Sequence, residues 1–239
     1  MSDPTLSIVT IARDKKEFEA WRQRLSEQTF DDYEICYSTT DGIPQAWNEA
    51  ISKANGQIIL FTETDTYPLH DDWLETVVDQ YSDNADNVVH FGEFRGYNPF
   101  NFSNTAVSAD LMKQYSLNES YAVGEDSELF ARMDKEGVEF EHDLNVPVFH
   151  ESKSTDKVLS RSFDYGRVKA RCAINHGRLG PSKNTDNTTY NSSNRDRVLF
   201  FVERIKQVIM SQLASVLFFI GFGIEYISHL ISGTNRETE

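Results

Sequence analysis

The chain has 239 residues, enough for one large domain or for one domain with an appendage, and enough to bury a substantial core. Its 38 acidic and 23 basic residues give a formal net charge of −15, which argues against nucleic acid as a partner because phosphates would be repelled. The strong acidity and low lysine use suggest a source that lives at high salt, where self-repulsion between charges is screened. Cys36 and Cys172 are expected to be reduced thiols of the core.

The first sixty residues alternate between strand and helix patterns. Strands are predicted at 6–12, 33–39 and 57–62, and helices at 15–28 and 43–54. This alternation predicts parallel strands joined by right-handed crossovers, and therefore a doubly wound, mostly parallel α/β sheet flanked by helices.

The pattern continues less regularly up to residue 151. We predict a helix at 71–83, a strand at 87–94, a helix at 125–137 and strand material at 138–151. The stretch 95–123 is rich in Asn, Ser and Tyr and is predicted to be irregular.

The strand at 57–62 ends in an unusual way, because "GQIILFTETDTYP" (56–68) passes directly from buried residues to two carboxylates. In open α/β sheets ligands bind at the carboxyl ends of the strands. Glu63 and Asp65 at such a position could share one divalent cation, and their oxygen ligands suit Mg²⁺ or Mn²⁺ held together with substrate phosphates. The alternative interpretation is a solvated acidic turn.

The composition changes twice after residue 150. A folded domain over 1–179 is followed by a polar loop or linker at 180–197 and by an apolar helical tail at 198–239. Residues 207–224 carry no charge, which is borderline for crossing a bilayer. The tail is therefore interpreted as membrane-associated, either spanning the bilayer or lying in its interface, and the alternative is a core helix.

Several segments resemble, in sequence order, the inverting glycosyltransferases of family 2. They are "LSIVTIARD", "LSEQTFDDYEI", "GIPQAWNEAISKANGQIILFTETDTYP", "DDWL" and "GEDSELFARMDKEG", and the resemblance covers roughly residues 6 to 150. It implies a GT-A fold, a nucleotide-sugar donor (a UDP or GDP sugar) and a divalent metal, Mg²⁺ or Mn²⁺.

The resemblance also implies roles for individual residues. "ETD" stands where the family carries its DxD motif, so Glu63 and Asp65 would hold the metal. His150 would approach the metal or the diphosphate, and the alternative is an ordinary histidine at the end of a strand. The pair "ED" of "GEDSEL" would supply the general base, Asp126, with Glu125 beside it, although a helix start also stabilises carboxylates for purely structural reasons. The residues expected to bind the donor are Ala12, Arg13, Asp14, Asp41, Asn48, Glu63, Thr64 and Asp65.

Two arginines add positive charge to a chain that is otherwise short of it. Arg167 and Arg171 lie at i and i+4 on one face of a predicted helix. They are candidates for binding a phosphate, or they pair with the acidic surface instead.

We therefore expect a glycosyltransferase that acts at the cytoplasmic face of the cell membrane on a lipid-linked acceptor of the polyprenyl or dolichyl phosphate type. Basic residues precede the apolar tail, which keeps the catalytic domain cytoplasmic by the positive-inside rule, and the start of the chain does not resemble a signal peptide. One alternative is a polysaccharide-building transferase with a soluble glycan acceptor. A sugar nucleotidyltransferase is less favoured, since "IARDKKEF" lacks the glycines of a phosphate loop, and a non-catalytic binding protein is less favoured because both acidic motifs are present.

Overall fold

The structure is a computed structural model that describes residues 3–82, 87–94, 100–144, 146–151, 155–177 and 215–229. The chain divides into two compact units. The described residues up to Glu151 belong to the first unit, whereas helix α6 (Thr155–His176) and a helix at 215–229 belong to the second. The sequence prediction extends the first domain to residue 179, beyond α6.

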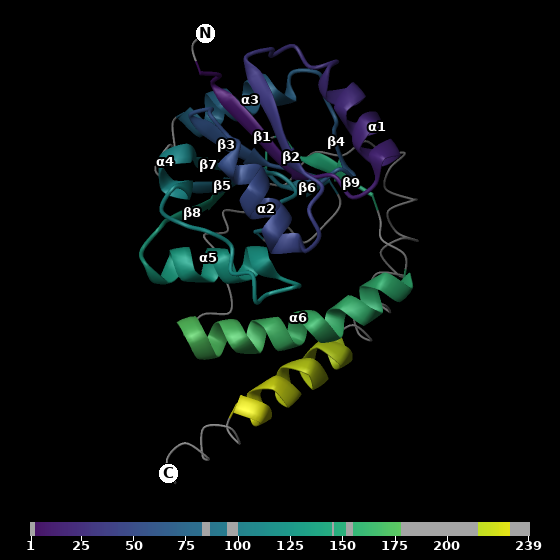
Figure 1. Cartoon of the computed structure of the whole chain (residues 1–239), viewed down its shortest axis with the longest axis vertical. Helices are drawn as coiled ribbons and strands as arrows, with labels where there is room; N and C mark the ends of the chain where they lie inside the picture. Colours follow the sequence, from purple (N-terminus) through teal and green to yellow (C-terminus); the bar gives the residue numbers. More distant parts are fainter. Residues whose placement is uncertain are drawn as a thin grey trace. The chain divides into compact units, whose positions relative to one another are not determined.

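The first unit is built around a six-stranded sheet (Figure 1). Its strands, in spatial order, are β2 (Tyr33–Ser38), β1 (Leu6–Ile11), β3 (Ile58–Phe61), β7 (Thr105–Ser108), β5 (Val88–His90) and β8 (Phe140–His142). Strand β7 is antiparallel to both of its neighbours, while the other pairings are parallel. The predicted α/β architecture with a mostly parallel sheet is confirmed.

Helices cover both faces of this sheet because its central strands are apolar on both sides. Ile58 and Leu60 of β3 pack in one cluster with α1 (Lys15–Leu25) and α3 (Trp73–Ser82). Ile59 and Phe61 alternate to the other face, where α2 (Ile43–Ser52) and α5 (Glu125–Lys135) contribute the facing side chains. Period-two alternation along a buried strand produces this division of the core.

The chain order places a switch point beside β1. From β1 the chain passes through α1 to β2 on one side, and then through α2 to β3 on the other side. The segments that follow the carboxyl ends of β1 and β3 therefore begin side by side, and such a crevice is where open α/β sheets bind ligands.

A second, three-stranded sheet brings a distant segment to the same region. Its order is β4 (Thr66–Pro68), β9 (Val148–His150) and β6 (Glu93–Phe94). Thr66 is paired with His150 across the antiparallel β4–β9 ladder. The register therefore holds the end of β9 next to the residues that follow β3.

Two sequence predictions are corrected in this unit. The single strand predicted at 87–94 is two strands, β5 and β6, in different sheets, because the chain turns at Gly92 with a φ of +83°. The stretch predicted to be irregular at 95–123 contains β7 and the short helix α4 (Ala109–Met112). Strand β7 has the sequence TAVS, which is too short and too polar to give a strong strand pattern.

In the second unit, α6 crosses the helix at 215–229 at very close range. A Cβ atom added to Gly166 would lie 2.0 Å from the carbonyl oxygen of Phe218, and one added to Gly221 would lie 2.1 Å from that of Phe163. Both positions therefore require glycine. Next to this crossing, Nε of Arg167 and Nε of Arg171 lie 2.9 and 2.5 Å from the two carboxylate oxygens of Glu225.

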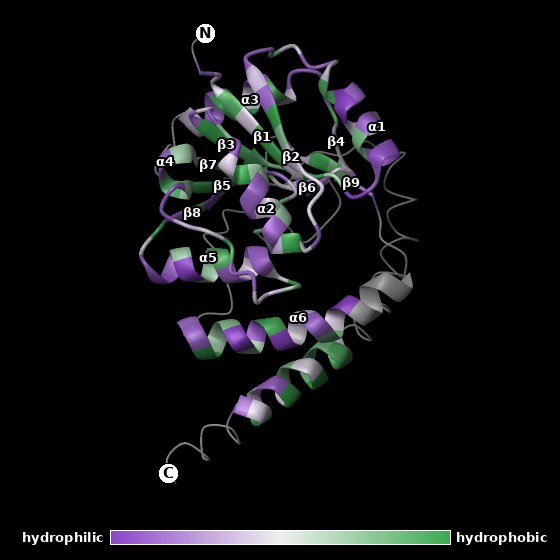
Figure 2. Cartoon of the chain, in the orientation of Figure 1, coloured by the Kyte–Doolittle hydropathy of each residue, from purple (hydrophilic) through white to green (hydrophobic). Residues whose placement is uncertain are grey.

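The helix at 215–229 also exposes much of its apolar surface, and Figure 2 colours most of it hydrophobic. Its exposed apolar side chains are Val216, Phe219, Ile220, Ile224, Tyr226 and Ile227. Within the described ranges, no helix has both the length and the hydropathy needed to cross a membrane. The predicted linker at 180–197 and the tail residues 198–214 and 230–239 lie outside the described residues.

Candidate functional site

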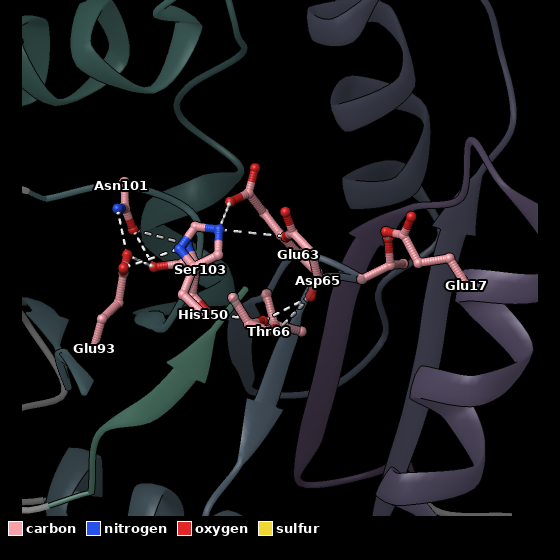
Figure 3. A network of polar contacts seen from close by, with 10 residues as sticks. Glu17, Glu63, Asp65, Thr66, Glu93, Asn101, Ser103 and His150 are labelled. Atoms are coloured by element: carbon pink, nitrogen blue, oxygen red, sulfur yellow. Dashed lines mark hydrogen bonds and ion pairs between the residues drawn. The ribbon is translucent and has the colours of Figure 1, made fainter. Parts of the chain in front are cut away.

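The acidic turn after β3 is held in shape by threonine side chains. The backbone N–H and the hydroxyl of Thr66 both donate to the carbonyl of Glu63, at 3.0 and 2.6 Å. The hydroxyl of Thr64 donates to a carboxylate oxygen of Glu17 on α1. The turn is thus anchored at both threonines, and Glu63 and Asp65 point toward His150 (Figure 3).

Glu63, Asp65 and His150 form a three-residue cluster whose geometry suits a divalent cation. Nε2 of His150 lies 3.4 Å from Oδ1 of Asp65 and 3.5 Å from Oε2 of Glu63, and all three ligand atoms lie within 4.8 Å of one another. Both separations exceed a good hydrogen bond, and the buried Nε2 has no hydrogen-bond partner among the described residues. Two carboxylates and an orphaned imidazole nitrogen around one point are the donor set that a divalent metal would satisfy.

The other nitrogen of His150 faces a third carboxylate. Nδ1 of His150 and Oε2 of Glu93, on β6, are 2.9 Å apart. Burial lowers the pKa of His150, but the carboxylates of Asp65, Glu93 and Glu63 around the ring outweigh burial and raise this pKa to about 10. Without a metal, an imidazolium cation therefore neutralises part of the cluster's negative charge.

The second acidic motif begins α5. Gly124 precedes it with a φ of +70°, a left-handed conformation that an L side chain would strain, and Glu125 and Asp126 occupy the first turn of the helix. Burial raises the pKa of Glu125, and the charges of Asp126 and Glu63 raise it further, to about 8, against the opposing charge of Arg13. Glu125 thus holds a proton at neutral pH.

The charges of Glu63 and Arg13 affect the pKa of Glu125, so the start of α5 lies near both residues. Glu63 follows β3 and Arg13 follows β1, so both acidic motifs lie at the same edge of the sheet.

An open pocket of about 570 Å³ lies where β1 and β2 end. Its lining residues are Ala12, Arg13, Lys15, Phe18, Glu19, Tyr37, Thr39, Thr40, Asp41 and Gly42. Of the predicted donor-binding residues, Ala12, Arg13 and Asp41 line this pocket. The rings of Phe18 and Tyr37, whose centroids are 4.4 Å apart, give it an aromatic wall.

Three other predicted donor-binding residues make structural contacts in the described chain. Asp14 caps α1 by accepting hydrogen bonds from the backbone N–H groups of Lys16 and Glu17, at 2.8 and 3.0 Å. Asn48 binds both the backbone N–H and the carbonyl of Leu117, and Thr64 bonds to Glu17. A role for these three residues in donor binding stays a prediction.

The sequence predicts that Arg167 and Arg171 either bind a phosphate or pair with acidic groups. The structure favours pairing, since each arginine contacts one oxygen of Glu225. Their predicted binding of a phosphate stays a prediction.

Sequence reasoning missed Glu93 and Glu49. Glu49 accepts hydrogen bonds from Ser38, Thr40 and Lys53, and so fixes the loop that lines the pocket. Glu49 has no sequence signal of its own, because an acidic residue on an exposed part of a helix is common. For Glu93, its position after a buried apolar run, like that of Glu63, is the one signal that could have drawn notice.

Comparisons with known proteins agree with this arrangement. The model of the family "Glycosyl transferase family 2" matches residues 10–138, which is more than half of the chain. No curated protein sequence matches the chain.

Solved structures share the fold at low identity. S. aureus TarS is 13% identical with a TM-score of 0.56, and the match covers 71% of this chain and 39% of TarS. The mannosyltransferase PcManGT from Pyrobaculum calidifontis, solved with GDP-Man and Mn²⁺, is 12% identical with a TM-score of 0.60, and the match covers 100% of this chain and 82% of that one. Glucosyl-3-phosphoglycerate synthase from Mycobacterium tuberculosis is 14% identical with a TM-score of 0.50, and the match covers 78% of this chain and 84% of that enzyme.

The chain thus spans well under half the length of TarS, and identities this low establish the fold alone. The family model matches the stretch that carries both acidic motifs, from Glu63 to Asp126, together with the residues that follow β1. The chain belongs to glycosyl transferase family 2.

Proposed function

We propose that this chain is a metal-dependent, inverting glycosyltransferase that moves a sugar from a UDP or GDP sugar to a lipid-linked acceptor at the cytoplasmic face of the cell membrane. The observation that supports the proposal is that two acidic groups lie at the same edge of the sheet. Glu63, Asp65 and His150 form one group, and Glu125 and Asp126 form the other.

The two groups suit different tasks. Glu63, Asp65 and His150 would hold a divalent cation, which supplies positive charge for the leaving diphosphate. The imidazole ligand favours Mn²⁺ over Mg²⁺, because Mg²⁺ prefers oxygen ligands. The nucleoside would occupy the pocket between the ends of β1 and β2, with its base near Phe18, Tyr37 and Asp41.

Asp126 would act as the general base. An acceptor hydroxyl must lose its proton as it attacks the anomeric carbon from the face opposite the leaving group. Asp126 at the first turn of α5 would take that proton, while Glu125, which is protonated at neutral pH, adds no further negative charge. A single displacement of this kind inverts the anomeric configuration.

The lipid-linked acceptor is supported by the second unit. The helix at 215–229 exposes large apolar side chains such as Phe219, which is 70% exposed, and the sequence around it is strongly apolar. A polyprenyl or dolichyl phosphate carrier would match a protein held at a membrane surface.

One experiment tests the proposal as a whole. Purified full-length protein is incubated with labelled UDP and GDP sugars, Mn²⁺ and a lipid extract, and the organic phase is analysed for a labelled product. A glycolipid that depends on Mn²⁺ supports the proposal. Label that appears only on added soluble glycans would replace the lipid acceptor with a polysaccharide acceptor, and no transfer to any acceptor would overturn the assignment.

A further inference from the structure

We infer that Glu93 is a positioning residue, which orients His150 and fixes which of its nitrogens faces the metal. The inference rests on the metal site of the proposed function and extends it to a residue that neither acidic motif contains.

The strand pairing aims Glu93 at His150. Glu93 is opposite Val148 in the parallel β6–β9 ladder, and His150 follows Val148 by two residues. Side chains of paired residues, and of residues two apart on one strand, point to the same face of a sheet. The Glu93 carboxylate and the His150 ring therefore share one face, where Nδ1 and Oε2 are 2.9 Å apart.

Glu93 lies on the far side of the imidazole from the other two carboxylates. In Figure 3 the ring of His150 stands between Glu93 and the pair Glu63 and Asp65. An ionised carboxylate has no proton to donate, so the ring nitrogen that faces Glu93 must carry the hydrogen, and Glu93 fixes the Nδ1–H tautomer. The lone pair of Nε2 is then directed at Glu63 and Asp65, as a metal ligand requires.

Glu93 is itself fixed in place. Its second oxygen, Oε1, accepts hydrogen bonds from Nδ2 of Asn101 at 2.8 Å and from the hydroxyl of Ser103. Ser103 is fully buried, and its backbone N–H bonds to Oδ1 of Asn101 at 2.9 Å. Both carboxylate oxygens are thus engaged, so Glu93 cannot swing round to become a ligand without breaking this support.

The test compares Mn²⁺ affinity in the full-length protein, measured by the electron paramagnetic resonance signal of free Mn²⁺, alone and with UDP or GDP present. We expect Glu93→Ala and Glu93→Gln to weaken Mn²⁺ binding by about 10- to 100-fold, with Glu93→Gln less affected because its amide oxygen still accepts from Nδ1–H. Glu34→Gln is the matched control, because Glu34 also accepts several hydrogen bonds from Ser7, Asn55 and Gly56 but lies on β2 of the six-stranded sheet, whereas Glu93 lies on β6 of the three-stranded sheet.

A double-mutant comparison separates positioning from general loss of structure. In a His150→Ala background, Glu93→Gln should cause no further loss of Mn²⁺ affinity, because Glu93 acts on the metal only through His150. Wild-type affinity in both Glu93 variants, or an equal loss with and without His150, would overturn the inference while leaving the metal site standing. A wild-type protein that binds no Mn²⁺ would overturn the metal site and the inference together.

Discussion

Oδ1 of Asp65 lies 3.4 Å from Nε2 of His150, and the carbonyl of Asp65 accepts a hydrogen bond from the backbone N–H of Glu151 at 2.9 Å. Side-chain and backbone contacts therefore join the turn after β3 to the end of β9. The ligand cluster is built by the three-stranded sheet as much as by the acidic motif itself.

We predict that Asp65→Ala abolishes Mn²⁺-dependent binding of the donor nucleotide, because the remaining carboxylate and imidazole leave the cation with one anionic ligand fewer. Calorimetric titration with UDP and GDP, with and without Mn²⁺, measures the effect, and circular dichroism checks the fold. The control is Asp110→Ala, which removes an exposed carboxylate that forms an ion pair with Lys113. Donor binding that survives in Asp65→Ala, or that persists in wild type under chelator, would contradict the metal assignment.

We predict that Asp126→Asn lowers kcat by about two to four orders of magnitude while leaving donor affinity unchanged, the usual range for loss of a general base. Steady-state kinetics gives kcat once the lipid-extract experiment has identified an acceptor, and titration gives donor affinity. Exposed Glu119, changed to Gln, is the control for loss of one negative charge.

The stereochemistry of the product checks the same assignment independently. Nuclear magnetic resonance of the product should show an inverted anomeric linkage. A retained linkage would exclude single displacement, and a defect confined to donor affinity would make Asp126 a binding residue.

Much of this site follows from local sequence, but the histidine's support does not. Strand β3 and the acidic turn are predictable because an uninterrupted apolar run and its polar ending lie within a few consecutive residues. The position of Glu93 depends on a turn at Gly92 and on a two-residue strand, and its hydrogen bonds come from Asn101 and Ser103 in a stretch predicted to be irregular. Contacts set by tertiary pairing leave no periodic pattern for the sequence to display.

The same limit applies to the sheet order. The parallel strands β1, β2 and β3 are joined by helices with clear apolar faces, which makes their arrangement predictable. Strand β7 enters between β3 and β5 as an antiparallel strand of four residues, and only its pairing partners define it.

Glu125 should make the stability of the metal-free protein depend on pH. Its pKa is raised from 4.5 to about 8 in the folded protein, so between these values the folded state binds more protons than the unfolded state. The free energy of unfolding must then fall as pH rises through this window. We predict that Glu125→Gln removes this contribution, so that the variant gains roughly 2–4 kcal/mol relative to wild type across the window.

Urea unfolding in the presence of a chelator, at several pH values, measures this difference. Glu34→Gln is a control of opposite sign, because hydrogen bonds from Asn55 and Ser7 outweigh burial and lower the pKa of Glu34. The stabilisation that Glu34 contributes is therefore lost only as the pH falls below 4.5, outside the window in which Glu125 titrates. A difference between Glu125→Gln and wild type that does not change with pH would show that Glu125 is ionised in the folded protein.

The last prediction concerns the apolar helix at 215–229. Its exposed side chains Val216, Phe219, Ile220, Ile224 and Ile227 recur at helical spacing and therefore form one stripe, which is typical of a helix lying in a membrane interface. The other side of this helix is held against α6 by the close approach at Gly166 and Gly221 and by the ion pairs of Glu225 with Arg167 and Arg171. The stripe therefore lies on a helix that is fixed to its neighbour. We predict that deleting residues 198–239 moves the protein from the membrane fraction to the soluble fraction, and that it lowers transfer to a lipid-linked acceptor far more than donor hydrolysis.

Substitutions test the stripe without removing the tail. Phe219→Glu and Ile227→Glu should each weaken binding to lipid vesicles by roughly tenfold or more, since burial of a large apolar side chain contributes about 1.5–3 kcal/mol. Ser228→Glu adds the same charge at an exposed polar position of the same helix and should have a smaller effect. Vesicle cosedimentation of the full-length proteins gives the affinities, and thermal unfolding shows whether each variant is intact. If Phe219→Glu unfolds the protein while vesicle binding by the folded fraction is unchanged, the stripe packs against protein rather than lipid, and the membrane assignment fails.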